Sequence, residues 1–394
     1  MTAVSPRPSP SITQTKVDRR VFSDEEVYKQ EMKILFQDGW TFVGLEAEIP
    51  NPGDFRRSWM GELPVIMSRA RDGSVKVVEN ACSHRGALVA LESKGNCSTF
   101  TCIYHQWVYG ADGKLLGVPL RKNYTDGQHK DRGGLRAARV ETFAGLVWAT
   151  FGEVEPLIGY LAEAAPHLDA VLRGGEVEIL GYHRYEVQGN WKLFFENTQD
   201  AYHASLLHNF SQALGIYTVG DNLVFENGHG AIKWDMVSLT DEIMERHLAD
   251  KAFKMKDYKL FQSATQPGPG GFNRVMGVFP NALVLEEWDM LNVRHIVPKG
   301  VDRAELHTVA LGLKGDSAEI RAKRARDYGN FFGPAGFAGR DDVVAVKAVQ
   351  ATEGVTSIDT SFMALGDLDA KSGDLEGEYT VRGFYGNYRE RMGF

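Results

Sequence analysis

The sequence predicts an α+β fold, in which a small β-rich domain precedes a larger domain of strands and helices. From residue 40 to about 151, short runs of alternating apolar residues are broken by Gly, Pro and Asp, as in antiparallel strands. Strand patterns return at 282–286, 291–297 and 305–313, before a charged helix expected over 317–331. This order of elements favours two domains of different size.

The first element expected in the chain is an amphipathic helix that ends at Gly39. Ser23 and Glu26 have the spacing of a capping box. Apolar residues then recur on one helical face, at Tyr28, Met32, Leu35 and Phe36. Residues 1–20 are rich in Ser, Thr and Pro, and are expected to form a flexible arm, not a secretory signal. After the β-rich region, the pattern predicts a helix at 160–172 and a strand at 176–187.

Composition excludes several classes of protein. The formal net charge of −8 and the pI of about 5.8 disfavour binding to the phosphates of nucleic acid. The sequence contains no run of about eighteen apolar residues, so no membrane span is expected. Three Cys in 394 residues provide no disulfide framework. The expected location is therefore a reducing cytoplasm.

Two short motifs each combine one Cys with one His. Cys82-Ser-His84 is followed by Cys102-Ile-Tyr-His105. Thiolates suit ferric iron and sulfide bridges, and two imidazoles on one iron raise the reduction potential of a cluster. A structural zinc site is the alternative, although zinc fingers usually place both Cys in one motif and both His in the other. We interpret the four residues as ligands of a [2Fe–2S] cluster, and Cys97 between them as a small buried or loop residue.

A second candidate metal site lies in the segment 189–208. Asp200 and His203 are three residues apart, so they share one face of a helix. His203 and His208 are five apart, and they converge only if the helix ends, bulges or widens between them. Two His and one carboxylate, with open positions, are the ligands of a mononuclear iron that activates dioxygen. Two ordinary histidines on a surface helix are the alternative.

A later segment, 333–342, ends with two adjacent acids, Asp341 and Asp342. Each would share a helical face with small or apolar residues that follow it, so periodicity does not separate them. Both are also explained as acids at a helix start, which the helix macrodipole favours.

These motifs resemble those of one protein family. Residues 82–115 read C-x-H-R-G … C-x-Y-H-x-W-x5-G-x-L, which resembles the Rieske cluster site in the large subunit of the aromatic ring-hydroxylating oxygenases. Residues 190–208 resemble that family's N-W-K … E-N-x-x-D-x-Y-H-x4-H motif. Residues 333–337 resemble its G-P-A-G-F block, and residues 382–385 its R-G-F-Y block. The resemblance covers nearly all of the chain from about Val21 to Phe394.

The resemblance implies roles for the site residues. The expected ligands of a Rieske [2Fe–2S] cluster are Cys82, His84, Cys102 and His105, and those of a mononuclear Fe(II) are His203, His208 and Asp342. The family pattern thus selects Asp342 over Asp341. Asp200 and Asn197 are the expected catalytic residues. Asp200 is expected to connect the iron to the cluster of a neighbouring subunit, through that cluster's ligand corresponding to His105.

The resemblance also implies an architecture. A flexible arm (1–20) and an amino-terminal helix that packs with the catalytic domain (21–39) would precede a Rieske domain (40–155). The catalytic domain (156–394) would contain a curved antiparallel sheet flanked by helices. The expected assembly is a head-to-tail trimer, α3 or α3β3, with a small β subunit. A ferredoxin, a reductase, or both would deliver electrons from NAD(P)H.

The substrate expected is an aromatic acid. The chain looks closest to the aromatic-acid branch, which includes salicylate 5-hydroxylase and terephthalate dioxygenase, so acids resembling salicylate, anthranilate, benzoate or terephthalate are candidates. By resemblance, Arg294 and Arg382 stand where carboxylate-binding arginines occur, although relatives that act on plain hydrocarbons also carry Arg there.

Other functions remain open from the sequence. The same metal centres are compatible with monohydroxylation, with demethylation, or with cis-dihydroxylation of a neutral hydrocarbon. A Rieske electron carrier would need only the first half of the chain. A zinc-stabilised binding protein is the remaining rival.

Overall fold

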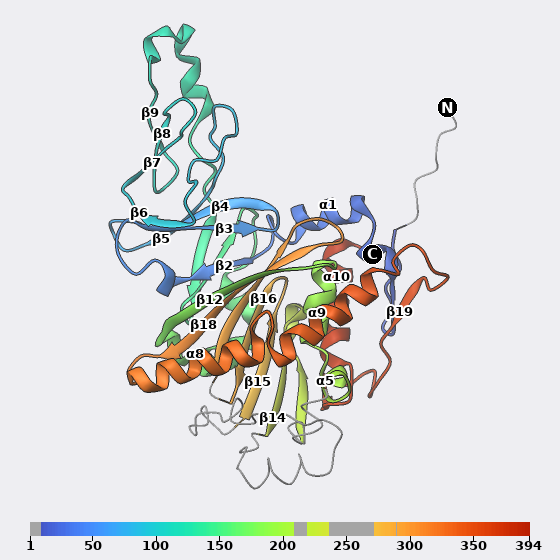
Figure 1. The fold of residues 1–394 in the computed structure, drawn as a ribbon. Helices are drawn as coiled ribbons and strands as arrows, with labels where there is room; N and C mark the ends of the chain where they lie inside the picture. The colour runs from blue at the N-terminus through green and yellow to red at the C-terminus, as the bar shows by residue number, and fades with distance from the viewer. Residues whose placement is uncertain (1–8, 209–218, 236–271, 289) are drawn as a thin grey trace, which may run out of the picture. The chain divides into compact units, whose positions relative to one another are not determined.

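A computed structural model describes residues 9–208, 219–235, 272–288 and 290–394. The chain divides into two compact units. The larger contains residues 1–31, 161–171 and 180–394, and the smaller contains residues 32–160 and 172–179. The expected α+β class is confirmed, with short strands in the smaller unit and long strands with helices in the larger one (Figure 1).

The smaller unit consists of three antiparallel sheets. The first has the order β10-β11-β2, formed by Arg139–Phe143, Leu146–Thr150 and Thr41–Leu45. The second has the order β5-β4-β3-β6, formed by Val75–Glu79, Leu63–Arg69, Asp54–Met60 and Lys94–Asn96. The third has the order β7-β8-β9, formed by Thr99–Thr101, Val108–Gly110 and Leu115–Gly117. The predicted β-rich region is therefore confirmed.

The larger unit is built on one eight-stranded sheet. Its order is β12-β18-β17-β16-β15-β14-β13-β20, and every pair from β18 to β20 is antiparallel. The strands are Val177–Val187, Ala304–Leu313, Met290–Pro298, Ala282–Glu287, Phe272–Val278, Gly230–Asp235, Gly220–Val224 and Ser372–Asp374. The strands expected near 176–187, 282–286, 291–297 and 305–313 are all present.

Helices of the larger unit cover this sheet. They are α4 (Trp191–Thr198), α5 (Ala201–Leu207), α8 (Ala318–Phe332), α9 (Phe337–Gln350) and α10 (Tyr379–Met392). Helix α8 contacts β17 and β18, α4 contacts β15 and β17, and α10 contacts β13 and β14 (Figure 1). Helix α9 packs against both α4 and α8. The chain therefore brings α4, α5 and α9 together over the middle of the sheet.

The helix expected over 160–172 is two short helices, α2 (Leu157–Leu161) and α3 (Ala164–Leu172). A two-stranded ladder pairs β1 (Lys16–Asp18) with β19 (Thr360–Phe362). Among the described residues, no helix combines the length and apolar character needed to cross a membrane.

The first predicted helix differs from the observed one at both ends. Helix α1 spans Glu25–Ile34, and the carboxylate of Asp24 accepts hydrogen bonds from the backbone N–H groups of Glu26 and Val27. Ser23 instead closes the preceding 3₁₀ turn, because its N–H donates to the carbonyl of Arg20. The capping residue predicted from spacing was therefore wrong by one position, and the helix ends before Gly39.

A buried ion pair anchors α1 within the larger unit. The side chains of Glu31 and Lys192 are fully buried, and the carboxylate Oε1 lies 2.5 Å from Nζ. The indole of Trp191 donates to Oε2 at 2.8 Å, and the hydroxyl of Tyr388 donates to Oε1 at 2.5 Å. Helices α1, α4 and α10 thus meet at the carboxylate of Glu31. Because this buried charge has an ion-pair partner and hydrogen-bond donors, the cost of its burial is offset.

Candidate metal centres

The two Cys-His motifs form two loops with the same backbone geometry. In the first, the N–H of Gly86 bonds the carbonyl of Cys82 at 2.8 Å. In the second, the N–H of Gln106 bonds the carbonyl of Cys102 at 2.9 Å. Gly86 and Gln106 both have positive φ, at 74° and 56°. Each loop therefore turns back on itself at the fourth residue after its Cys.

The side chains of these loops are arranged as a cluster site requires. Cys82 and Cys102 are buried, whereas His84 and His105 are partly exposed, with ring centroids 4.7 Å apart. The ring of His84 stacks on Trp107 at 4.9 Å, and its Nδ1 atom is buried without a hydrogen-bond partner. Two buried thiols and two neighbouring imidazoles, one with an unsatisfied nitrogen, fit a cluster with one buried and one more exposed iron.

Two further hydrogen-bonding features support the loops. The buried amide of Asn80 accepts from the N–H groups of Val89 and Ala90 and donates to the carbonyl of Ala90, all at 2.9 Å. The Tyr109 hydroxyl lies 3.1 Å from Sγ of Cys82 and accepts from the N–H of Ser83 at 3.2 Å. Since a ligating thiolate has no proton, the tyrosine is then the donor to sulfur.

A break between α4 and α5 brings the second group of residues together. Helix α4 ends at Thr198, and Asp200 starts α5 as its N-cap, accepting from the N–H of Tyr202 at 2.9 Å. His203 lies in the first turn of α5. His208 follows the last residue of α5 and has non-helical dihedrals, with φ −83° and ψ 86°. The sequence left open whether the helix ends, bulges or widens between the two histidines. In the structure the helix ends before His208, so that His208 turns back toward His203.

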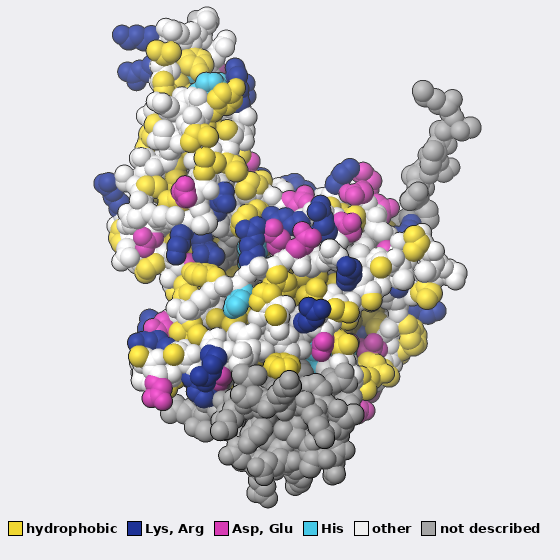
Figure 2. Space-filling view, in the orientation of Figure 1, with side chains coloured by type: hydrophobic (Ala, Val, Ile, Leu, Met, Phe, Trp, Pro, Cys, Tyr) yellow, Lys and Arg dark blue, Asp and Glu magenta, His cyan; other side chains and the backbone are white. Residues whose placement is uncertain are grey.

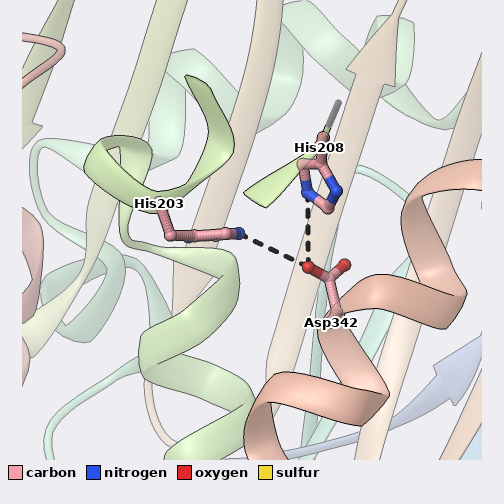
Figure 3. A group of neighbouring side chains, drawn as sticks. All are labelled: His203, His208 and Asp342. Carbon is pink, nitrogen blue, oxygen red and sulfur yellow. Dashed lines mark ion pairs between the residues drawn. The ribbon is translucent and has the colours of Figure 1, made fainter. Parts of the chain in front are cut away.

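Helix α9 supplies the carboxylate that faces both imidazoles. The Oδ1 atom of Asp342 lies 3.4 Å from Nε2 of His203 and 3.3 Å from Nε2 of His208 (Figure 3). One ligand atom from each residue lies within 4.8 Å of the others. Adjacent ligand atoms that each lie about 2.1 Å from one metal ion are roughly 3.0–3.4 Å apart, which matches the separation of Oδ1 from each Nε2. The three residues therefore fit a single metal ion with open coordination positions.

The electrostatics of this group favour a cation. Burial alone would lower the pKa of His203, but the carboxylates of Asp200 and Asp342 more than offset that effect and raise it to about 10. Burial would raise the pKa of Asp342, but the two imidazoles hold it well below its usual range. Oδ1 of Asp342 is buried and has no hydrogen bond within the described part of the chain. A metal ion would satisfy this oxygen directly.

Each imidazole also has a carboxylate near its other nitrogen. Oδ2 of Asp200 lies 3.6 Å from Nδ1 of His203, and Oδ2 of Asp341 lies 3.4 Å from Nδ1 of His208. Such carboxylates fix the tautomer and orientation of a metal-binding His. The sequence placed Asp200 on the same helical face as His203, but it gave no sign of the contact between Asp341 and His208. Neither Asp341 nor Asp342 is a helix-start acid, because the first turn of α9 contains no acidic residue.

Asn197 is also placed beside this group. Its Nδ2 atom lies 3.4 Å from Nε2 of His203, and no described residue forms a hydrogen bond with its buried Oδ1 atom. Asn197 therefore extends from the last turn of α4 to the face of His203 that is turned toward Asp342.

A pocket opens beside the three residues. Its described walls combine residues of α4, α5, α8 and α9 with side chains of the sheet, among them Ile232, Val275, Leu285, Glu287 and Arg294. Ile232, Val275 and Leu285 are direct cross-strand neighbours, so they project from one face of the sheet. This lining is mainly apolar, with a few charged groups, as in most small-molecule sites.

The two arginines singled out from the sequence have different surroundings. Arg294 lines this pocket, is 3% exposed, donates from Nε to the amide oxygen of Asn292 at 3.1 Å and lies over the ring of Phe332. The guanidinium of Arg382 instead donates to the carbonyls of Leu365 and Asp367, at 2.6 and 3.0 Å. Arg382 is not among the described residues that line the pocket.

Sequence reasoning also missed Glu287, which lines the pocket from β16. The only signal was a pair of acids, Glu286 and Glu287, at the end of an apolar strand. Strand alternation places one of the two on the pocket face, but the sequence does not say which face that is.

Comparison with known protein families matches both parts of the chain. Residues 39–143 match the model described as the Rieske [2Fe-2S] domain, and residues 175–393 match the ring hydroxylating alpha subunit (catalytic domain). A solved structure of naphthalene 1,2-dioxygenase with indole in its active site superposes with a TM-score of 0.81 and 27% identity, covering 96% of this chain and 92% of that one.

Curated relatives are similar over nearly their full length. The chain is 34% identical to the anthranilate 1,2-dioxygenase large subunit of Burkholderia cepacia, over 96% of this chain and 94% of the relative. It is 34% identical to the large oxygenase component of salicylate 5-hydroxylase from Ralstonia sp, over 94% of this chain and 93% of the relative. It is 33% identical to a terephthalate 1,2-dioxygenase alpha subunit from Comamonas sp, over 97% of this chain and 96% of the relative.

Proposed function

The chain belongs to the ring-hydroxylating alpha-subunit family, with a Rieske domain and a catalytic domain, and from this premise we propose that it is the oxygenase component that hydroxylates an aromatic acid. The observation that carries the proposal is that His203, His208 and Asp342 share one pocket with a buried arginine. Iron held by the three residues would supply dioxygen activation, and the cluster held by Cys82, His84, Cys102 and His105 would supply electrons.

Arg294 is the proposed anchor of the substrate carboxylate. Its Nε atom is engaged by Asn292, and the aromatic ring of Phe332 lies 4.8 Å from the guanidinium carbon. In the described part of the chain, no hydrogen bond or ion pair involves its two Nη atoms. A guanidinium held in this way presents two parallel N–H groups to a planar carboxylate. Arg382 is less suited to this role, because backbone carbonyls already engage both of its terminal nitrogens.

The apolar wall would then hold the ring of the substrate. Ile232, Val275 and Leu285 form a row across three strands, on the same wall as Arg294. A carboxylate fixed at one point and a ring held by apolar contacts leave the molecule a single orientation in the pocket. This fixed orientation is the contribution of the protein to regiochemistry.

Asp200 and Asn197 are the proposed positioning and relay residues of the site. Oδ1 of Asp200 caps α5 and Oδ2 faces His203, so one side chain both starts the helix and orients the ligand. Family resemblance adds that this carboxylate connects the iron with the cluster of a neighbouring subunit. We therefore propose a head-to-tail trimer, with or without a small β subunit, and domain boundaries at residues 39/40 and 155/156.

The surface around the cluster loops fits a protein partner. Tyr104 and Leu120 are 60% and 77% exposed and border a hollow that also contains His84 and His105. Figure 2 shows hydrophobic and basic side chains together on the unit that carries β7–β9. Such a patch beside exposed cluster ligands suits the docking of a ferredoxin, a reductase or the neighbouring subunit.

Product analysis tests the proposed function. The purified oxygenase, with a compatible reductase and NAD(P)H, would be supplied with salicylate, anthranilate, benzoate, terephthalate and naphthalene. We expect hydroxylated products from at least one acid and a much lower rate with naphthalene. Turnover of naphthalene alone would contradict an aromatic-acid oxygenase, and an absence of any oxygenated product would contradict the oxygenase assignment.

A further inference from the structure

One more charged side chain lines the pocket besides Asp200, Asp342 and Arg294, and none of the roles proposed above uses it. Glu287 ends β16, is 3% exposed and forms part of the same wall as Arg294. Its Oε2 atom is buried and has no hydrogen-bond partner among the described residues. A buried polar atom without a partner is costly, so its retention needs an explanation.

The register of the sheet places Glu287 and Arg294 on one face, but not next to each other. Leu283 is paired with Arg294 and Leu285 with Asn292, so Glu287 stands two same-face positions beyond the Arg294 pair. Two such steps separate the residues by roughly 13 Å along the strands. Both residues line the pocket, so a ligand there would face them at two different points of the wall.

The two groups do not neutralise each other. Within the described part of the chain, neither Glu287 nor Arg294 forms an ion pair. Burial raises the pKa of the Glu287 carboxyl to about 8, the charge of Arg294 opposes this shift, and the charge of Asp342 adds to it. The pocket therefore contains one unpaired cation and one unpaired acid at different points of the same wall.

A ligand with matching groups would satisfy both. A carboxylate would pair with the two Nη atoms of Arg294, and a hydrogen-bond donor elsewhere on the ring would reach the oxygen of Glu287. A plain hydrocarbon would leave both buried groups unsatisfied. An unsubstituted benzoate would leave only the glutamate unsatisfied.

We propose that Glu287 determines substrate specificity by accepting a hydrogen bond from a hydroxyl or amino substituent of the aromatic acid whose carboxylate Arg294 holds. This inference rests on the proposed function and narrows its substrate class to hydroxy- or amino-substituted aromatic acids. Glu287 acts as a specificity residue, not a catalytic one, because the reacting atoms are those above the iron site.

Equilibrium binding tests the inference without turnover. Dissociation constants would be measured by calorimetry on the full-length protein with its metals bound, without reductant, for 2-, 3- and 4-hydroxybenzoate, 2-aminobenzoate, benzoate and benzene-1,4-dicarboxylate. We expect at least one hydroxy- or amino-substituted acid to bind roughly ten-fold tighter than benzoate, the gain of one hydrogen bond to a buried polar group.

Variants separate the roles of the two residues. Glu287→Met keeps the volume but removes the acceptor, so the preference over benzoate should fall to about one while benzoate still binds. Glu287→Gln keeps an acceptor oxygen and should retain most of the preference. Leu285→Met, on the same strand and wall, changes shape only and should affect both ligands equally. Arg294→Gln should weaken all of the acids together.

The outcomes distinguish this inference from the function on which it rests. If no aromatic acid binds to the wild type, the proposed function fails. If benzoate binds as tightly as every substituted acid, or the dicarboxylate binds tightest, the role of Glu287 is refuted while the acid-binding function stands. An unchanged preference in Glu287→Met would also refute it.

Discussion

At the scale of single residues, the iron site depends on which oxygen faces which nitrogen. Asp342 faces Nε2 of both histidines, whereas Asp200 and Asp341 each face the Nδ1 of one. A neutral imidazole carries one proton, and an acceptor at Nδ1 holds that proton there, so that Nε2 is left as a lone-pair donor. The two outer carboxylates thus prepare both imidazoles for a metal ion.

Replacing the adjacent acids tests this division of roles. Asp342→Ala removes a proposed ligand, so mononuclear iron and hydroxylation should be lost, while the cluster absorption stays intact. Asp341→Ala removes only the acceptor at His208, and we expect a loss of roughly 10- to 100-fold in iron affinity or activity. Metal analysis measures the iron content, absorption spectra report the cluster, and product assays measure hydroxylation. Retention of iron in Asp342→Ala together with its loss in Asp341→Ala would reverse our assignment.

Asp200→Asn separates capping from electron transfer. Asparagine still caps a helix well, so α5 and the iron content should remain near normal. The substitution removes the charge that faces His203. We expect reduction of the cluster to be unaffected and product formation to be lost. Single-turnover oxidation of a pre-reduced cluster, with substrate and oxygen present, is the measurement. Wild-type cluster oxidation and product yield in this variant would remove Asp200 from the relay.

Tyr109 offers a test at the cluster itself. Its hydroxyl is placed to donate to Sγ of Cys82, and a bond of this kind stabilises the more negative, reduced cluster. Tyr109→Phe should therefore lower the reduction potential, by roughly 20–60 mV for the loss of one hydrogen bond of about 0.5–1.5 kcal/mol. Protein-film voltammetry measures the shift. Tyr124→Phe, a ring that packs at 6.3 Å from Trp107, is the control and should leave the potential unchanged.

At the scale of elements, local patterns predicted the helices and strands better than their ends. The alternating runs of the strands and the charged helical pattern over 317–331 were sufficient for the long elements, because one buried face dictates their periodicity. The cap of α1 was misplaced because the preceding 3₁₀ turn uses Ser23, and that turn has no clear sequence signal. The end of α5 before His208 was foreseen only as a need of the two histidines, and the break at Gln199 and Asp200 was not foreseen.

Some residues of the candidate site could also be identified from the sequence, and others could not. Ligands that lie close in sequence, such as His203 and His208, are visible as a motif, and Asp342 is visible through family resemblance. Glu287 was missed, because its place in the pocket depends on the pairing of β15, β16 and β17. Register across a sheet is a tertiary property, and a one-residue shift would turn Glu287 away from the pocket.

The buried Glu31–Lys192 pair tests how α1 is held. Glu31→Ala leaves a fully buried ammonium without its partner, which costs about 3–5 kcal/mol of folding stability. We expect a lower denaturation midpoint for this variant. Glu26→Ala, on the same helix, removes a carboxylate that is 76% exposed and should change stability by less than about 0.5 kcal/mol. Equal effects of the two substitutions would show that the buried pair contributes little.

At the scale of the whole molecule, the two proposed metal centres draw their ligands from different compact units. All four cluster residues belong to residues 32–160, and all three iron residues belong to residues 180–394. No described residue contributes to both sets. The proposed function nevertheless requires that electrons pass from a cluster to an iron. Each centre can therefore assemble within its own unit, whereas electron transfer requires both centres.

Cys102→Ser tests this separation. The substitution removes one proposed thiolate from a buried position, so the red-brown colour, the acid-labile sulfide and the EPR signal of the reduced cluster should all disappear. Because the proposed iron ligands lie in the other unit, mononuclear iron and the binding of an aromatic acid should persist, while turnover should stop because no electrons reach the iron. Metal and sulfide analysis, calorimetry and product assays report these properties independently.

A colourless wild type with stoichiometric zinc would refute the cluster. Loss of mononuclear iron and acid binding along with the cluster, in a variant that remains folded by circular dichroism, would show that the catalytic unit depends on the cluster for its own structure.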